Sequence, residues 1–382
     1  MKTIALLLYL SLQFLFYNSE LFSESSSYIN CTGTACNNLP TSLKSQINEL
    51  PSQLNSQYLS KIINNMNEAS AAVNSVSSLQ GVGSVNTFQI GAGMTVSGSQ
   101  QDPITVKYRD VQFKDLPNIG VGVSPNAMIG VNLGWLLGQG ERDADEIANR
   151  SILHRINLYA SGFKVNTNTA DSKASIPDSF TYTGNLSISQ AGLGARVDII
   201  QPGDGVLFRF LGLNAGVSVR KQDFSFDLED TKSTNTKFTL SKLSGTWNSQ
   251  SNLEYTSKTY SIPVDFRTGF QILRMVSIFG GLGSSKSISE TSLVIQRSGP
   301  VRFTSDPSVA ALNSAASSLT PTSADIAAGN LDMKLSESSK RNYSQSYALV
   351  GFEIDIWKLK LITEAYLMEN VKSVSAGVKL DF

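Results

Sequence analysis

Apolar and polar residues alternate one by one along most of the chain after residue 85, most clearly in the last ten residues. The apolar residues there occupy every second position: Val374, Ala376, Val378, Leu380 and Phe382. The positions between them hold Ser, Gly, Lys or Asp. Because successive side chains of a β-strand point to opposite faces of a sheet, this period of two predicts a strand with one apolar and one polar face.

The same period recurs often enough to predict an all-β fold for residues 85–382. Alternating segments begin near Phe88, Ile104, Ile129, Ala191, Leu211, Ile262, Val276, Ala348 and Leu361, and segment 151–165 alternates less regularly. We expect ten strands between about Ile104 and Phe382, with Leu133, Trp135 and Leu137 continuing the strand of Ile129. The number becomes twelve if 85–97 joins the sheet.

The connections between these segments alternate in length. Tight turns are predicted at 202–205, 273–274 and 357–359, and long polar loops at 166–182, 227–258 and 299–342. Two connections depart from the alternation, since 368–372 is short and 138–150 is of medium length. A β-barrel of up-and-down strands has short turns at one end and longer loops at the other, so the pattern favours a barrel over a sandwich.

Residues 39–79 carry the one clear helical period, with apolar residues at spacings of mainly three and four. We expect Pro51 to divide this helix, because proline disrupts a helix interior. The opposite face is mostly Asn, Ser and Gln. Three interpretations stay open: a helix on the protein's own surface, a helix that plugs or lines a polar lumen, and a coiled-coil segment.

The final strand, with its apolar row ending in Phe382, resembles the last strand of bacterial outer-membrane β-barrels. The resemblance implies a transmembrane antiparallel up-and-down barrel of about 10–12 strands in the outer membrane of a double-membraned bacterium. It also implies two partners, the membrane lipid and the assembly machinery that reads such a strand. The residues of this assembly signal would be Val374, Ala376, Val378, Leu380 and Phe382.

Charge and composition narrow the function classes. The formal net charge is zero and 16% of residues are charged, against about 25% in a typical soluble domain. The absence of a basic excess argues against a nucleic-acid partner. After the first apolar run no apolar segment is long enough for a transmembrane helix. A search for such runs does not detect transmembrane strands, because their apolar and polar residues alternate.

The first residues read as an export signal, a short positive start followed by an apolar run. We therefore expect a signal peptide at 1–23, a periplasmic or lumen-inserted segment with a Cys loop and an amphipathic helix at 24–84, and the barrel at 85–382. The two cysteines, Cys31 and Cys36, are expected to form a disulfide. A lipidated Cys31 is the alternative. Two Cys and one His do not make a zinc site, and no cofactor is indicated.

The polar faces of the predicted strands carry charged residues that a barrel would collect in its lumen. The lumen-facing candidates are Arg196, Asp198, Arg220, Asp265, Arg267, Glu353, Asp355, Glu364 and Lys379. Opposite charges on neighbouring strands can pair there. The alternative is the solvated outer face of an ordinary antiparallel sheet.

No catalytic constellation is evident, so we expect a protein without enzymatic activity. His154, the single histidine, reads as a structural or rim residue. The primary interpretation is a small-solute channel, plugged or unplugged by the N-terminal helix. The alternative is a surface-exposed adhesin or ligand-binding barrel that works through the long external loops. A secreted soluble β-sandwich that binds a ligand is the further alternative.

Overall fold

Ten strands close into a barrel in the part of the chain that the structure describes. This computed structural model describes residues 27–382 apart from 38, 40, 77–78, 83–84, 109–110, 117, 140–150, 169–181, 204, 206, 231–232, 241–242 and 306–327. The predicted signal peptide and the 309–319 region of the last long loop lie outside these residues.

The barrel strands are β2 (Phe88–Gln100), β5 (Ile119–Asn132), β6 (Ile156–Asn168), β7 (Tyr182–Ile200), β8 (Phe208–Asp230), β10 (Leu243–Ile272), β11 (Val276–Ser305), β12 (Ala328–Ile356), β13 (Leu359–Leu367) and β14 (Val371–Asp381). Neighbouring strands are antiparallel, and β14 pairs with β2 while β12 pairs with β13. The sheet is therefore a ring. Closure confirms the predicted all-β barrel and excludes the sandwich.

Two strand predictions were wrong. Ile104–Tyr108 (β3) pairs with Val111–Leu116 (β4) in a separate two-stranded sheet, so the first barrel strand is β2. Leu133–Leu136 forms the short helix α5, because the Asn132 side chain accepts hydrogen bonds from the backbone N–H groups of Gly134 and Trp135. Such an N-cap favours a helix over a continued strand.

An apolar band surrounds the outer face of the barrel. Its exposed side chains include Ile129, Leu193, Val217, Ile262, Phe266, Leu282, Val350 and Val374. The residues that alternate with them, such as Thr95, Ser124 and Ser375, are buried inside. An apolar outer face around a polar interior is the arrangement of a β-barrel that spans a membrane, so the described strands form a transmembrane β-barrel.

The tight turns at 273–275 and 357–358 lie at the same end of the barrel as Phe382. The ring of Phe382 stacks on that of Phe88 at the start of β2, with centroids 4.5 Å apart. Short turns face the periplasm in barrels of this kind, so the opposite end faces outward.

The predicted long loops at 227–258 and 299–342 proved to be mainly strand. β10 and β11 pair from Leu243 and Ser305 to Ile272 and Val276, with a gap only at Asn248 and Ser249, and β11 pairs with β12 as far as Ala328. These polar segments lie outside the membrane, where a strand needs no apolar lipid-facing row. We name the part beyond the apolar band the outer extension: residues 221–230, 243–260, 287–305 and 328–342 with the edge strands β1 (Tyr28–Gly33) and β9 (Thr234–Leu240).

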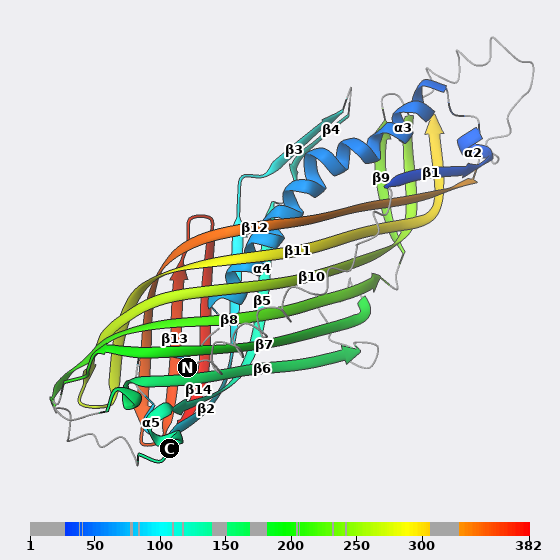
Figure 1. Ribbon diagram of the computed structural model, residues 1–382. Helices are drawn as coiled ribbons and strands as arrows, with labels where there is room; N and C mark the ends of the chain where they lie inside the picture. The colour runs from blue at the N-terminus through cyan, green and yellow to red at the C-terminus, as the bar shows by residue number, and fades with distance from the viewer. Residues whose placement is uncertain are drawn as a thin grey trace, which may run out of the picture.

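One continuous helical segment runs from the outer extension into the barrel (Figure 1). It comprises α3 (Thr41–Leu54), a π-helical turn, η1 (Asn55–Leu59), and α4 (Ser60–Val76); a short helix, α2 (Thr34–Asn37), precedes it. Pro51 lies inside α3 and does not divide the helix, contrary to the prediction. The irregular turn η1 follows instead, one turn after the missing N–H of the proline.

The contacts of α4 distinguish among the three interpretations of this helix, which were a surface helix, a helix in the lumen and a coiled-coil segment. It contacts β2, β5, β8, β10, β11, β12 and β14, strands from around the ring. Its residues from Ala69 to Val76 are all buried. The helix therefore fills the lumen, while β1 pairs with the outer end of β12. No helix in the described residues is long and apolar enough to cross a membrane.

Candidate functional site

The contact between α4 and the barrel wall is made by small polar side chains. The Asn74 amide donates to Ser261 Oγ at 2.9 Å, and Ser75 Oγ donates to Ser285 Oγ at 2.8 Å. Ser70 lies 3.1 Å from the Tyr255 hydroxyl, whose pKa is raised by burial. The polar helix face that the sequence showed thus forms hydrogen bonds with the polar lumen, which satisfies groups that burial would otherwise destabilise.

Glycines in the wall let the helix approach closely. A Cβ placed on Gly120 would lie 2.1 Å from the carbonyl oxygen of Asn65, and one on Gly122 would lie 2.7 Å from that of Ala69. Both glycines point into the lumen from β5. The backbone of α4 therefore rests directly on this strand, and any side chain at Gly120 would displace it.

After α4 the chain crosses the lumen as the segment Leu79–Val82, which we name the crossing segment. All four residues are buried. Leu79 and Gly81 have positive φ angles of 51° and 67°, a conformation in which a non-glycine residue is held by its surroundings. The Leu79 side chain occupies the space over two paired glycines, Gly93 and Gly377.

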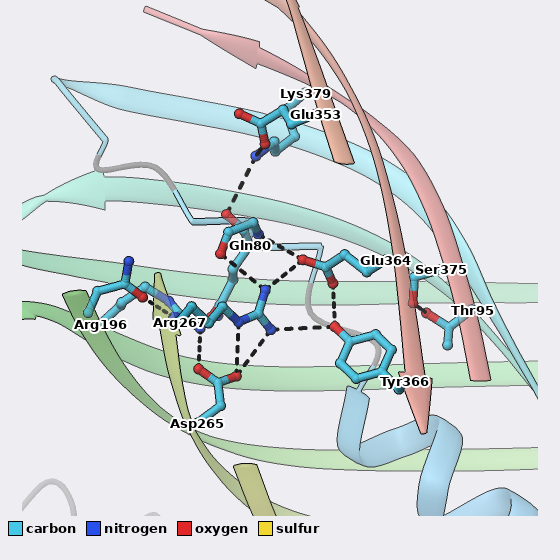
Figure 2. Close-up of polar contacts among 12 residues, drawn as sticks. Gln80, Thr95, Arg196, Asp265, Arg267, Glu353, Glu364, Tyr366, Ser375 and Lys379 are labelled. Carbon is cyan, nitrogen blue, oxygen red and sulfur yellow. Dashed lines mark hydrogen bonds and ion pairs between the residues drawn. The ribbon is translucent and has the colours of Figure 1, made fainter. Parts of the chain in front are cut away.

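Charged side chains from the wall hold the backbone of the crossing segment (Figure 2). Arg267 Nη1 donates to the Gly81 carbonyl at 3.0 Å, and the Gly81 N–H donates to Glu364 Oε1 at 3.2 Å. Arg196 Nη2 donates to the side-chain oxygen of Gln80 at 3.0 Å. The segment is therefore bound from several strands at once.

The same wall residues are paired with each other in a buried charge belt. Arg267 lies 2.6 Å from Glu364 and 3.1 Å from Asp265, which also accepts from Arg196 at 2.7 Å. A second pair joins Lys379 to Glu353 at 2.6 Å. Buried charges are stable only when they are paired and hydrogen bonded, and each of these ion pairs is also a hydrogen bond.

The structure brings the nine lumen candidates to the interior. Arg220 donates to the Asn74 carbonyl at 3.4 Å, at the end of α4. Asp198 is buried, and Asp355 is half-buried beside Gln271 and Lys360. Sequence reasoning missed Gln80 and Gly81, because nothing local marks a backbone that charged side chains from distant strands will bind.

Little space is left between the helix and the wall. Two cavities, one beside Ser70 of α4 and one beside Gln80 of the crossing segment, have volumes of about 10 Å³ each, which is about the room for one water molecule. The described residues contain no group of three His, Cys, Asp or Glu arranged to hold a metal ion. In its described parts the lumen is filled.

The remaining predicted residues lie outside this site. Cys31 and Cys36 form a disulfide between β1 and α2, so the Cys31 sulfur is occupied. His154 is buried near the periplasmic end, where its ring lies close to Gly134. The alternate apolar residues of β14 face the lipid, and their role as an assembly signal stays a prediction.

Comparison with known proteins gives one family match. The family model described as Lsa36-like matches residues 26–382, and no curated protein matches. Among solved structures, Ail of Yersinia pestis is 10% identical over 78% of this chain and 99% of its own, with a TM-score of 0.25. The outer-membrane protease OmpT of Escherichia coli is 10% identical over 77% and 95%, with a TM-score of 0.32.

Proposed function

Because the chain belongs to the Lsa36-like family and forms a barrel filled by its own helix, we propose that it is a surface-exposed outer-membrane protein that binds an external ligand. The outer extension is the working part in this proposal. The observation that carries it is the contrast between a filled lumen and strands that continue far beyond the membrane. Residues 243–260 of β10 alone add about 60 Å of strand at roughly 3.3 Å per residue.

The outer extension has apolar cores of its own, which favours a stable platform over loose loops. One core joins Leu59 and Ile63 of the helical segment to Tyr255, Leu293 and Leu335 of β10, β11 and β12. A second, near the tip, contains Cys36, Leu39, Ile47, Trp247 and Val301. Side chains locked by such packing present a preorganised surface, which lowers the entropic cost of binding.

No catalytic step is included in the proposal. The two lumen carboxylates of β12, Glu353 and Asp355, are both engaged by lysines, with Lys379 at 2.6 Å from Glu353 and Lys360 at 3.9 Å from Asp355. His154 is buried beside Gly134. These contacts support a structural role for the three residues.

Covering the outer extension should block binding, whereas covering another part of the outer rim should not. We would compare Ser298→Cys, an exposed site on β11, with Glu369→Cys in the turn between β13 and β14. Both should react with a maleimide-polyethylene glycol on intact cells, since the native cysteines are paired. The modified Ser298→Cys cells should lose adhesion to an epithelial cell layer, counted by microscopy, while the modified control cells keep it. Equal adhesion would contradict the proposal.

A gated small-solute channel is the second candidate, and one observation favours it. The contacts that hold α4 and the crossing segment are polar, so the wall left behind by a displaced helix would be wettable. Opening would require the crossing segment to leave Arg267, Glu364 and Arg196 together.

A disulfide between α4 and the wall separates the two candidates. Ser75→Cys with Ser285→Cys should cross-link readily, because the two hydroxyl oxygens lie 2.8 Å apart. We would record conductance in planar bilayers for the wild-type chain and for the cross-linked variant, each before and after dithiothreitol. We expect no steady conductance steps in any of these samples. Wild-type chain in dithiothreitol controls for reduction of the native disulfide. Steps that appear in the wild type and vanish on cross-linking would establish a gated channel instead.

A further inference from the structure

A groove of about 400 Å³ lies on the outer face of β8, β10, β11 and β12. Its apolar lining is formed by Val219, Tyr260, Ile262 and Ile288, which alternate with the inward-facing residues of their strands. The groove is open along the surface and separate from the lumen site. It is a feature of the lipid-facing side of the barrel.

The groove follows from the side chains that the strand register places side by side. Tyr260 lies opposite Ile288, and Ile288 lies opposite the smaller Asn342 of β12. Lys286 likewise stands between Ile262 and the short Ser344. Large side chains on β10 and β11 thus adjoin small ones on β12, and the step between them is the groove.

The groove lies where the apolar band ends on β8 and β10. The outermost large apolar side chains that are exposed on the described parts of these strands are Val217, Ile262, Leu282 and Val350. Toward the outer end, Val219 is the next lipid-facing residue of β8 after Val217, and Tyr260 is the next one of β10 after Ile262. This level corresponds to the boundary between the acyl chains and the headgroups of the outer leaflet, where aromatic residues concentrate.

Basic side chains border the groove, with Lys286 level with Ile262 and Lys221 level with Tyr260. Lys286 is exposed and lines the groove. The Lys221 ammonium lies 5.6 Å from the centre of the Tyr260 ring and 3.1 Å from Asp223, and Lys258 is the next outward-facing residue of β10. Lysines beside an apolar surface at this depth can reach headgroup phosphates while their stems stay in contact with lipid.

We propose that this groove binds one phospholipid of the outer leaflet, with an acyl chain against Val219 and Ile262 and an anionic headgroup at Lys286 and Lys221. The apolar lining and the basic rim match the two halves of such a molecule. The inference is independent of the external ligand proposed above, since it concerns a different face of the barrel.

Native mass spectrometry of the full chain in detergent tests this directly. Dioleoyl phosphatidylglycerol and dioleoyl phosphatidylcholine share their acyl chains and differ in headgroup charge. We expect one phosphatidylglycerol to be retained with at least about fivefold preference, as one lysine near a membrane surface contributes a factor of this order. Lys286→Glu should remove the preference. Ser344→Trp, which fills the groove from the outer face, should remove retention of both lipids.

Lys372→Glu is the matched control, because Lys372 is an exposed lysine on β14, on another part of the outer rim. It should retain the wild-type preference. If Lys372→Glu loses the preference for phosphatidylglycerol as much as Lys286→Glu does, the preference depends on net charge alone. If Ser344→Trp retains both lipids as the wild type does, the lipid binds elsewhere. Either result overturns the proposal. Heat-dependent gel mobility would verify that each variant is folded.

Discussion

Arg267→Ala is expected to lower the free energy of unfolding of the barrel by about 3–5 kcal/mol, the usual cost of removing one partner from a buried ion pair. Arg267 is 1% exposed and joins Asp265, Glu364 and the Gly81 carbonyl. Without Arg267, the buried carboxylate of Glu364 loses the positively charged side chain that it contacts. The crossing segment also loses one of its hydrogen bonds to the wall.

The measurement is urea unfolding of the detergent-refolded protein, followed by tryptophan fluorescence. Arg341→Ala removes an exposed arginine from β12 and should change stability by much less. Arg267→Lys should fall between the two, because it keeps the charge but loses the planar fork that contacts two carboxylates. If Arg267→Ala and Arg341→Ala unfold at the same urea concentration, the charge belt does not stabilise the filled lumen.

Gly120→Val is expected to prevent α4 from seating in the lumen. The new Cβ would lie 2.1 Å from the carbonyl oxygen and 2.4 Å from the carbonyl carbon of Asn65. Because backbone atoms of a packed helix cannot move aside as a flexible side chain can, the cost should reach or exceed the upper end of the range of about 1–3 kcal/mol for overpacked cores. Trypsin should then cut the chain near Lys61 at concentrations that leave the wild type intact.

Gly98→Val provides the control in the neighbouring strand. Gly98 faces outward from β2, and a Cβ added there meets no atom within 4 Å. The same substitution should therefore leave both the protease pattern and the heat-dependent gel mobility unchanged. Equal resistance of Gly98→Val and Gly120→Val to trypsin would mean that α4 does not rest on β5 as described.

Local patterns predicted most of the strands that cross the membrane and the direction of their side chains. The alternation from Val374 to Phe382 predicted both the strand and its two faces, because the period of two is a property of neighbouring residues. Arg196, Asp265 and Glu364 could be assigned to the interior for the same reason. The Asn and Ser face of the helix was visible too, although its partner was not.

Only the tertiary structure decided where the chain goes when the local pattern stops. The polar segment from Leu243 to Lys258 was predicted to be a loop, yet it is strand, because pairing with β11 supplies backbone hydrogen bonds that local sequence does not reveal. Arg267 binds Gly81, 186 residues away, and Glu364, 97 residues away. Such contacts depend on barrel closure and register. The sequence by itself thus determined the lipid-facing and lumen-facing rows, while long-range pairing decided that the lumen is filled and that the sheet extends outward.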